Sequence, residues 1–136
     1  MDQANSISTP MISSTHLSKF RGNAIPNDSQ YRSIVGALQY VTITRPEISF
    51  SVNKTSQFMQ NPTDEHWKAV KRILRYLKGT INFGLTLQAS SSMSITGYVD
   101  AHWGTDIDDR KSTTGYCIYL GKKSYFKVLK KTVYNF

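Results

Sequence analysis

The sequence contains almost no cysteine: Cys117 is the only one in 136 residues. A single thiol excludes an intramolecular disulfide and a thiolate-rich zinc site. The sequence also lacks any run of about 18 apolar residues, the length that a membrane-spanning helix needs. Its opening, "MDQANSIST", has an early acid and no apolar stretch, which argues against a secretory signal. We therefore expect neither a disulfide framework nor a membrane partner.

Acidic residues are also scarce: 9 Asp and Glu stand against 17 Lys and Arg, so the net charge is +8. An excess of basic residues is typical of proteins that bind nucleic acid. The excess is uneven, however, because residues 122–136 contain five lysines and no acid. The 39% of hydrophobic residues and 12% of aromatic residues are those of a globular chain.

Hydrophobic periodicity divides the chain. Residues 1–28 are rich in Ser, Thr, Asn and Pro and have no helical period, which predicts an extended or disordered lead-in. Apolar residues then recur at helical spacing through residues 29–80, predicting three helices at about 29–41, 46–59 and 63–79. Thr44 and Glu47, in "TRPE", have the spacing of a capping box at the start of the second helix.

The third helix is amphipathic in charge as well as in hydropathy. At 100° per residue, one arc of about 120° holds its apolar residues: Trp67, Val70, Ile73, Leu74 and Leu77. A separate arc holds its basic residues: Lys68, Lys71, Arg72, Arg75 and Lys78. Two interpretations stay open, a solvated basic face and a stripe of side chains that binds the phosphates of a nucleic acid.

From Gly79 onward the period of the pattern falls to two. Residues 83–87, 94–103 and 112–120 are predicted strands, and 124–129 also favours a strand. The acids of the intervening "GTDIDDRKS" fit a solvated turn better than a calcium loop. Helices followed by antiparallel strands predict an α+β fold. Asp100 lies alone within the predicted strand 94–103.

Three segments carry a family resemblance: "YRSIVGALQYVTITRPEISFSV", "PTDEHWKAVKRILRYLKGT" and "GYVDAHWG…DDRKSTTGYCIYLG". Their order and spacing resemble the Pol polyprotein of copia-type long-terminal-repeat retrotransposons, of the kind abundant in plants. The resemblance implies that residues 29–80 are a helical segment like the reverse-transcriptase thumb and connection. It implies that residues 81–121 are the truncated opening of a ribonuclease H domain. The expected fold is therefore a three-helix thumb-like part followed by an incomplete antiparallel ribonuclease H-like sheet.

The resemblance also implies what chemistry to expect. Ribonuclease H hydrolysis uses two magnesium ions held by several acids. Asp100 matches the first of these acids, while His102 stands where family members usually carry aspartate. The acidic helix that follows in the family, and the polymerase motif of a tyrosine and paired aspartates, do not occur in these 136 residues. We expect no enzymatic activity, no bound metal and no cofactor, with Asp100 as an inactive relic or a plain exposed strand residue.

The segment 122–136 departs from the family pattern. Read from the second base of codon 122, its possible codons allow much of the expected family sequence, so we hypothesise a frameshifted tail. The nucleotide sequence around that codon tests this hypothesis. Because such a tail was not selected to complete the sheet, an open sheet edge and some self-association are expected.

Three functions are compatible with the sequence. The favoured one is a non-catalytic remnant that binds duplex DNA or an RNA–DNA hybrid weakly through the third helix. The alternative is a metal-dependent ribonuclease H that a partner chain completes. A host-recruited protein-interaction module is the third.

Overall fold

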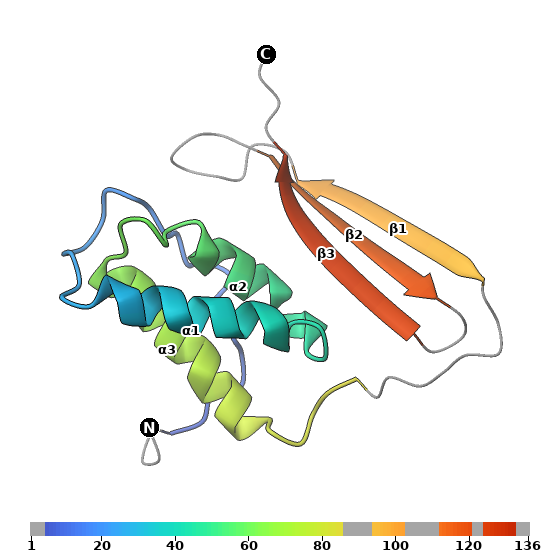
Figure 1. Cartoon of the computed structure of the whole chain (residues 1–136), viewed down its shortest axis with the longest axis horizontal. Helices are drawn as coiled ribbons and strands as arrows, with labels where there is room; N and C mark the ends of the chain where they lie inside the picture. Colours follow the sequence, from blue (N-terminus) through green and yellow to red (C-terminus); the bar gives the residue numbers. More distant parts are fainter. Residues whose placement is uncertain (1–4, 86–93, 103–111, 121–123, 133–136) are drawn as a thin grey trace. The chain divides into compact units, whose positions relative to one another are not determined.

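The computed structural model describes residues 5–85, 94–102, 112–120 and 124–132. The chain divides into two compact units, Met1–Gly84 and Leu85–Phe136, which are described separately. The elements, in chain order, are α1 (Asp28–Val41), the 3-10 helix η1 (Pro46–Ile48), α2 (Ser49–Ser56), α3 (Asp64–Gly79), β1 (Ile95–His102), β2 (Ser112–Leu120) and β3 (Ser124–Thr132) (Figure 1). The predicted α+β class is confirmed. None of the described helices is long and apolar enough to cross a membrane.

The first helix begins where its capping residues predict. The side chain of Asn27 accepts a hydrogen bond from the backbone N–H of Gln30 at 3.0 Å, which satisfies one of the free donors at the start of α1. Asp28 in the first turn pairs with Arg32 one turn later at 2.6 Å. The buried face repeats at helical spacing through Tyr31, Val35 and Leu38.

The expected capping box at "TRPE" is wrong. The hydroxyl of Thr44 points back to the carbonyl oxygen of Val41, 3.4 Å away, and no side chain caps η1. Glu47 instead accepts a hydrogen bond from Nε of Arg45 at 2.6 Å. The second helix is split into η1 and α2 and ends at Ser56, so it is shorter than the periodicity predicts.

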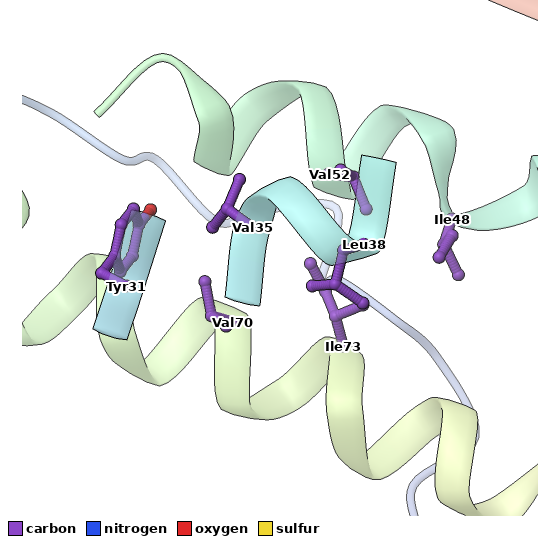
Figure 2. Close-up of a cluster of buried hydrophobic side chains, with 7 residues drawn as sticks. All are labelled: Tyr31, Val35, Leu38, Ile48, Val52, Val70 and Ile73. Atoms are coloured by element: carbon purple, nitrogen blue, oxygen red, sulfur yellow. The ribbon is translucent and has the colours of Figure 1, made fainter. Parts of the chain in front are cut away.

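The main core lies between the three helices. Figure 2 shows the side chains of Val70 and Ile73 pointing from α3 toward those of α1, while Ile48 and Val52 approach from η1 and α2. All seven residues of this cluster are buried: Tyr31, Val35, Leu38, Ile48, Val52, Val70 and Ile73. Burying one apolar side chain of this size stabilises the folded state by about 1.5–3 kcal/mol before the loss of conformational entropy is counted. This core fixes the rotation of α3 about its own axis.

Residues 5–25, called here the N-terminal strap, contain no helix, but they pack along α3. Leu17 is buried against Phe58 and Ala69 in a second apolar cluster. Ala24 forms an isolated antiparallel bridge with Thr63, immediately before α3. At the other end of the helix, a Cβ on Gly79 would lie 2.6 Å from the Cβ of Ser6. The strap therefore follows α3 from its first turn to its last.

The second unit contains one antiparallel sheet with the order β1-β2-β3. Asp100 of β1 is opposite Gly115 of β2, and Tyr119 of β2 is opposite Tyr125 of β3. β3 includes the predicted strand 124–129 and extends beyond it. The strand predicted at 83–87 is wrong for residues 83–85, which form no strand, and its remainder lies outside the described residues.

Candidate nucleic-acid interface

The amphipathic pattern of α3 is reproduced by its packing. Val70 and Ile73 are fully buried, and Trp67, Leu74 and Leu77 are half-buried against the same core. Because this arc faces the other helices, the basic arc of α3 is turned away from the core. The rotation that the sequence predicts is therefore the one that the structure has.

The first turn of α3 is fixed by a buried histidine. Thr63 and His66 form a capping box, in which the Thr63 backbone N–H donates to Nδ1 of His66 at 2.9 Å. Nδ1 therefore carries no proton, and Nε2 donates to the carbonyl oxygen of Ser18 at 3.1 Å. The imidazole also stacks on Phe58, with ring centroids 3.9 Å apart. His66 thus joins the strap to α3, a role that sequence analysis did not assign, although its position three residues after Thr63 was a signal for it.

The last turn of α3 is fixed by a buried arginine. Arg45, 5% exposed, donates from Nη1 to the carbonyl oxygen of Thr80 at 2.9 Å and from Nη2 to the Thr80 hydroxyl at 2.6 Å. Its guanidinium also lies 5.7 Å from the ring centroid of Tyr76. A cation near the C-terminus of a helix satisfies carbonyl groups that have no partner within the helix. Both ends of α3 are therefore held by side chains outside the basic arc.

Lys68 is the basic residue of the arc with the most compensated charge. Its Nζ lies 2.8 Å from a carboxylate oxygen of Glu65 and 3.6 Å from one of Asp64. The Glu65 hydrogen bond, followed by the charges of both acids, raises the pKa of Lys68. A phosphate that binds Lys68 must therefore compete with two local ion pairs.

Lys71 and Lys78 are the exposed lysines of the remainder of the arc. Nζ of Lys71 lies 5.6 Å from the centroid of the Trp67 ring, a cation–π distance that leaves the ammonium open to solvent. Lys78 belongs to the last turn of α3.

The two arginines of the arc are half-buried. Nη2 of Arg72 donates to the Thr9 hydroxyl of the strap at 2.8 Å. The Nε atoms of Arg72 and Arg75 are both enclosed and have no hydrogen-bond acceptor among the described residues. The five predicted residues thus share one side of α3 but differ in how far solvent, acids and the strap surround them.

Asp100 lies on β1, in the other unit, and its side chain is exposed. Alternation along the strand places Tyr98 on the same face of the sheet. The Tyr98 ring meets that of Tyr119 edge-on, with centroids 5.8 Å apart. His102 is paired with Thr113 through the backbone register, and its side chain lies outside the described part of the chain. The acids of the loop 103–111 also lie outside it.

The chain has clear relatives among retrotransposon proteins. It is 48% identical over 118 residues to the retrovirus-related Pol polyprotein from transposon RE2 of Arabidopsis thaliana, an alignment that covers 87% of this chain and 8% of that protein. It is 50% identical over 121 residues to the corresponding polyprotein from transposon RE1, covering 89% of this chain and 8% of that protein. The chain belongs to the family of copia-type retrotransposon Pol polyproteins. The predicted resemblance is confirmed.

One shorter relative also belongs to this set. An uncharacterized mitochondrial protein of Arabidopsis thaliana is 40% identical over 78 residues, which are 57% of this chain and 70% of that protein. No family model matches the chain, and no solved structure matches it. This Pol segment spans about 8% of the length of the RE1 and RE2 polyproteins. The activities of the whole polyproteins therefore cannot be assigned to it from the similarity alone.

The family resemblance implies a magnesium site in the ribonuclease H-like part of this Pol segment. A pair of magnesium ions requires several converging oxygen ligands. Within residues 5–85, 94–102, 112–120 and 124–132, no three His, Cys, Asp or Glu side chains come close enough to hold a metal ion. Asp100 by itself does not fit a two-metal site, because the described residues place no other candidate ligands with it.

Proposed function

We propose that this Pol segment is a non-catalytic remnant that binds duplex DNA or an RNA–DNA hybrid weakly through the basic arc of α3. The observation that carries the proposal is the opposition of the two arcs. The core holds Val70 and Ile73 inward, so the basic side chains project from one side of a rigid helix. Such a row of cations contacts the sugar–phosphate backbone without reading base sequence.

The strength of binding follows from the surroundings of each cation. Lys71 is exposed and lies on Trp67, so it binds phosphate without losing an ion pair. Lys68 must exchange partners with Glu65, and Arg72 with Thr9. Few of these cations can therefore contact a phosphate without giving up an existing partner. For this reason we expect a low affinity at physiological salt.

A salt titration of two charge-matched variants tests the binding. We expect Lys71→Gln to weaken binding to a labelled 20-base-pair duplex and to reduce the slope of log affinity against log salt by about one unit. Lys54→Gln removes the same charge from α2 and is the matched control. Fluorescence anisotropy measures both. Equal slopes in wild type, Lys71→Gln and Lys54→Gln would show that the basic arc of α3 is merely solvated.

Absence of catalysis is tested separately. A labelled RNA–DNA hybrid is incubated with the 136-residue chain in magnesium or manganese, and the products are resolved on a gel. We expect no cleavage above a no-protein control, and no difference between wild type and Asp100→Asn, because one carboxylate does not hold a productive metal pair. Metal-dependent cleavage that disappears in Asp100→Asn would support the alternative, a ribonuclease H activity.

A further inference from the structure

The strap contains a threonine with unusual surroundings. Thr9 is exposed, forms no helix or strand, and is followed by Pro10. Of the four prolines in the chain, only Pro10 follows a serine or threonine. An exposed Thr-Pro step outside helices and strands is the kind of peptide that proline-directed protein kinases accept. The same hydroxyl is already 2.8 Å from Nη2 of Arg72.

This contact uses one of the two N–H donors on one edge of the Arg72 guanidinium. Nη2 and Nε lie on the same edge of a guanidinium, and together they form the fork that binds two oxygens of one carboxylate or phosphate. In Arg72, Nη2 reaches Thr9, whereas Nε is enclosed with no acceptor in the described part of the chain. A phosphoryl group on the Thr9 hydroxyl would bring further acceptor oxygens to the Nη2 side of this fork.

We propose that Thr9 is a phosphorylation site and that the Arg72 fork receives its phosphate. A proline-directed kinase would transfer the γ-phosphoryl group of ATP to Oγ1 of Thr9. The new Oγ1–P bond replaces the bond between the γ-phosphorus and the leaving ADP, and the hydroxyl proton passes to the kinase's base. Phosphothreonine adds about −1.5 to −2 charge and three acceptor oxygens, which suit both Nη2 and Nε of Arg72.

This modification bears on the proposed function, on which the following consequence rests. Phosphothreonine at position 9 holds the strap more firmly beside the basic arc and neutralises Arg72 from within the molecule. A phosphate of the nucleic acid then competes with a covalently tethered phosphate for the same guanidinium. We expect phosphorylation to lower duplex affinity by about 3- to 10-fold at low salt, because it adds negative charge beside the basic arc.

The site is tested first by the kinase reaction on the intact chain. A purified proline-directed kinase and ATP are added, and the modified residue is located by mass spectrometry. We expect one phosphate on Thr9, and none on Thr9 in the Pro10→Ala variant. Ser8→Ala removes the neighbouring hydroxyl and is the matched control that keeps Thr9 modified. An unmodified Thr9, or equal modification in Pro10→Ala, would overturn the assignment of the site.

The fork is tested by a measurement that needs no nucleic acid. Phosphothreonine is installed at position 9, and its second ionisation is followed by ³¹P NMR in wild type and in Arg72→Lys, which keeps the charge but loses the fork. We expect this ionisation at least about 0.5 pH unit lower in wild type. Identical titrations would overturn the Arg72 contact even if duplex binding exists. If the titration shows the expected difference but the chain binds no duplex, the proposed function is refuted and the phosphorylation site is retained.

Discussion

Replacing Tyr31 with phenylalanine isolates one buried hydrogen bond in the core. Tyr31 is fully buried, and its hydroxyl donates to the carbonyl oxygen of Thr55 at 2.8 Å. That carbonyl keeps a second partner, the backbone N–H of Phe58 at 3.2 Å, so the variant leaves no unpaired acceptor. At neutral pH we therefore expect Tyr31→Phe to lower the free energy of unfolding by only about 1 kcal/mol.

The same substitution should have the opposite effect in alkali. Burial raises the pKa of Tyr31 above the ordinary value of 10.0. The folded state thus retains a proton that the unfolded state loses, so the stability contributed by the neutral phenol is complete below pH 10.0 and falls as pH rises above it. The loss is about 1.4 kcal/mol per pH unit. Phenylalanine has no proton to lose, so the two stability curves should meet close to one pH unit above that value.

Urea unfolding followed by far-ultraviolet circular dichroism measures both effects between pH 7 and pH 11. Tyr40→Phe is the matched control, because Tyr40 belongs to the same helix but is 78% exposed. We expect this control to follow wild type at every pH. Parallel curves for wild type and Tyr31→Phe across the alkaline range would refute the reasoning about the buried phenol.

Two further predictions concern the ends of α3. Arg45→Met should lower the free energy of unfolding by about 2–4 kcal/mol, and Arg45→Lys by nearly as much, because only a guanidinium reaches Thr80 and Glu47 together. Urea unfolding of both variants checks this, and an Arg45→Lys variant as stable as wild type would contradict a role for the fork. The backbone N–H of Asn23, followed by Lys68, lowers the pKa of Asp64 below 3.8, so this carboxylate contributes stability above that pH and loses it as pH falls through its depressed pKa. Asp64→Asn should therefore be less stable at neutral pH yet less sensitive to acid, and an acid titration with an unchanged slope would argue against the contact.

The helical half of the fold could be predicted because its signals are local. Val70 and Ile73 repeat with the helical period, and the period alone gives the rotation of α3 about its axis. The strand predicted at 83–87 is wrong for residues 83–85, because a short alternation containing Gly84 is a weak signal and a strand needs a neighbouring strand to be stable. β3 shows the reverse, since its alternation is paired with the full length of β2.

The surroundings of the basic arc could not be predicted, because they depend on contacts between distant residues. Arg72 and Thr9 are separated by 63 positions, and His66 and Ser18 by 48. No periodicity in the strap indicates where such an extended segment will lie. Arg45 did carry a local signal in "TRPE", but its capping interpretation assigned the wrong partners. Sequence analysis thus predicts which cations share the arc, and the structure shows which partners already occupy them.

Net charge alone overstates how many phosphates α3 can bind. Lys68 has two carboxylates beside it and Arg72 donates to Thr9 of the strap, so each must exchange a partner before it binds a phosphate. If about two phosphate contacts form, the slope of log affinity against log salt should be roughly −2, whereas five contacts would give roughly −4.5. A measured slope near the larger value would mean that Lys68 and Arg72 exchange their partners for phosphate. The expected value near −2 would show that the strap and the first-turn acids limit binding.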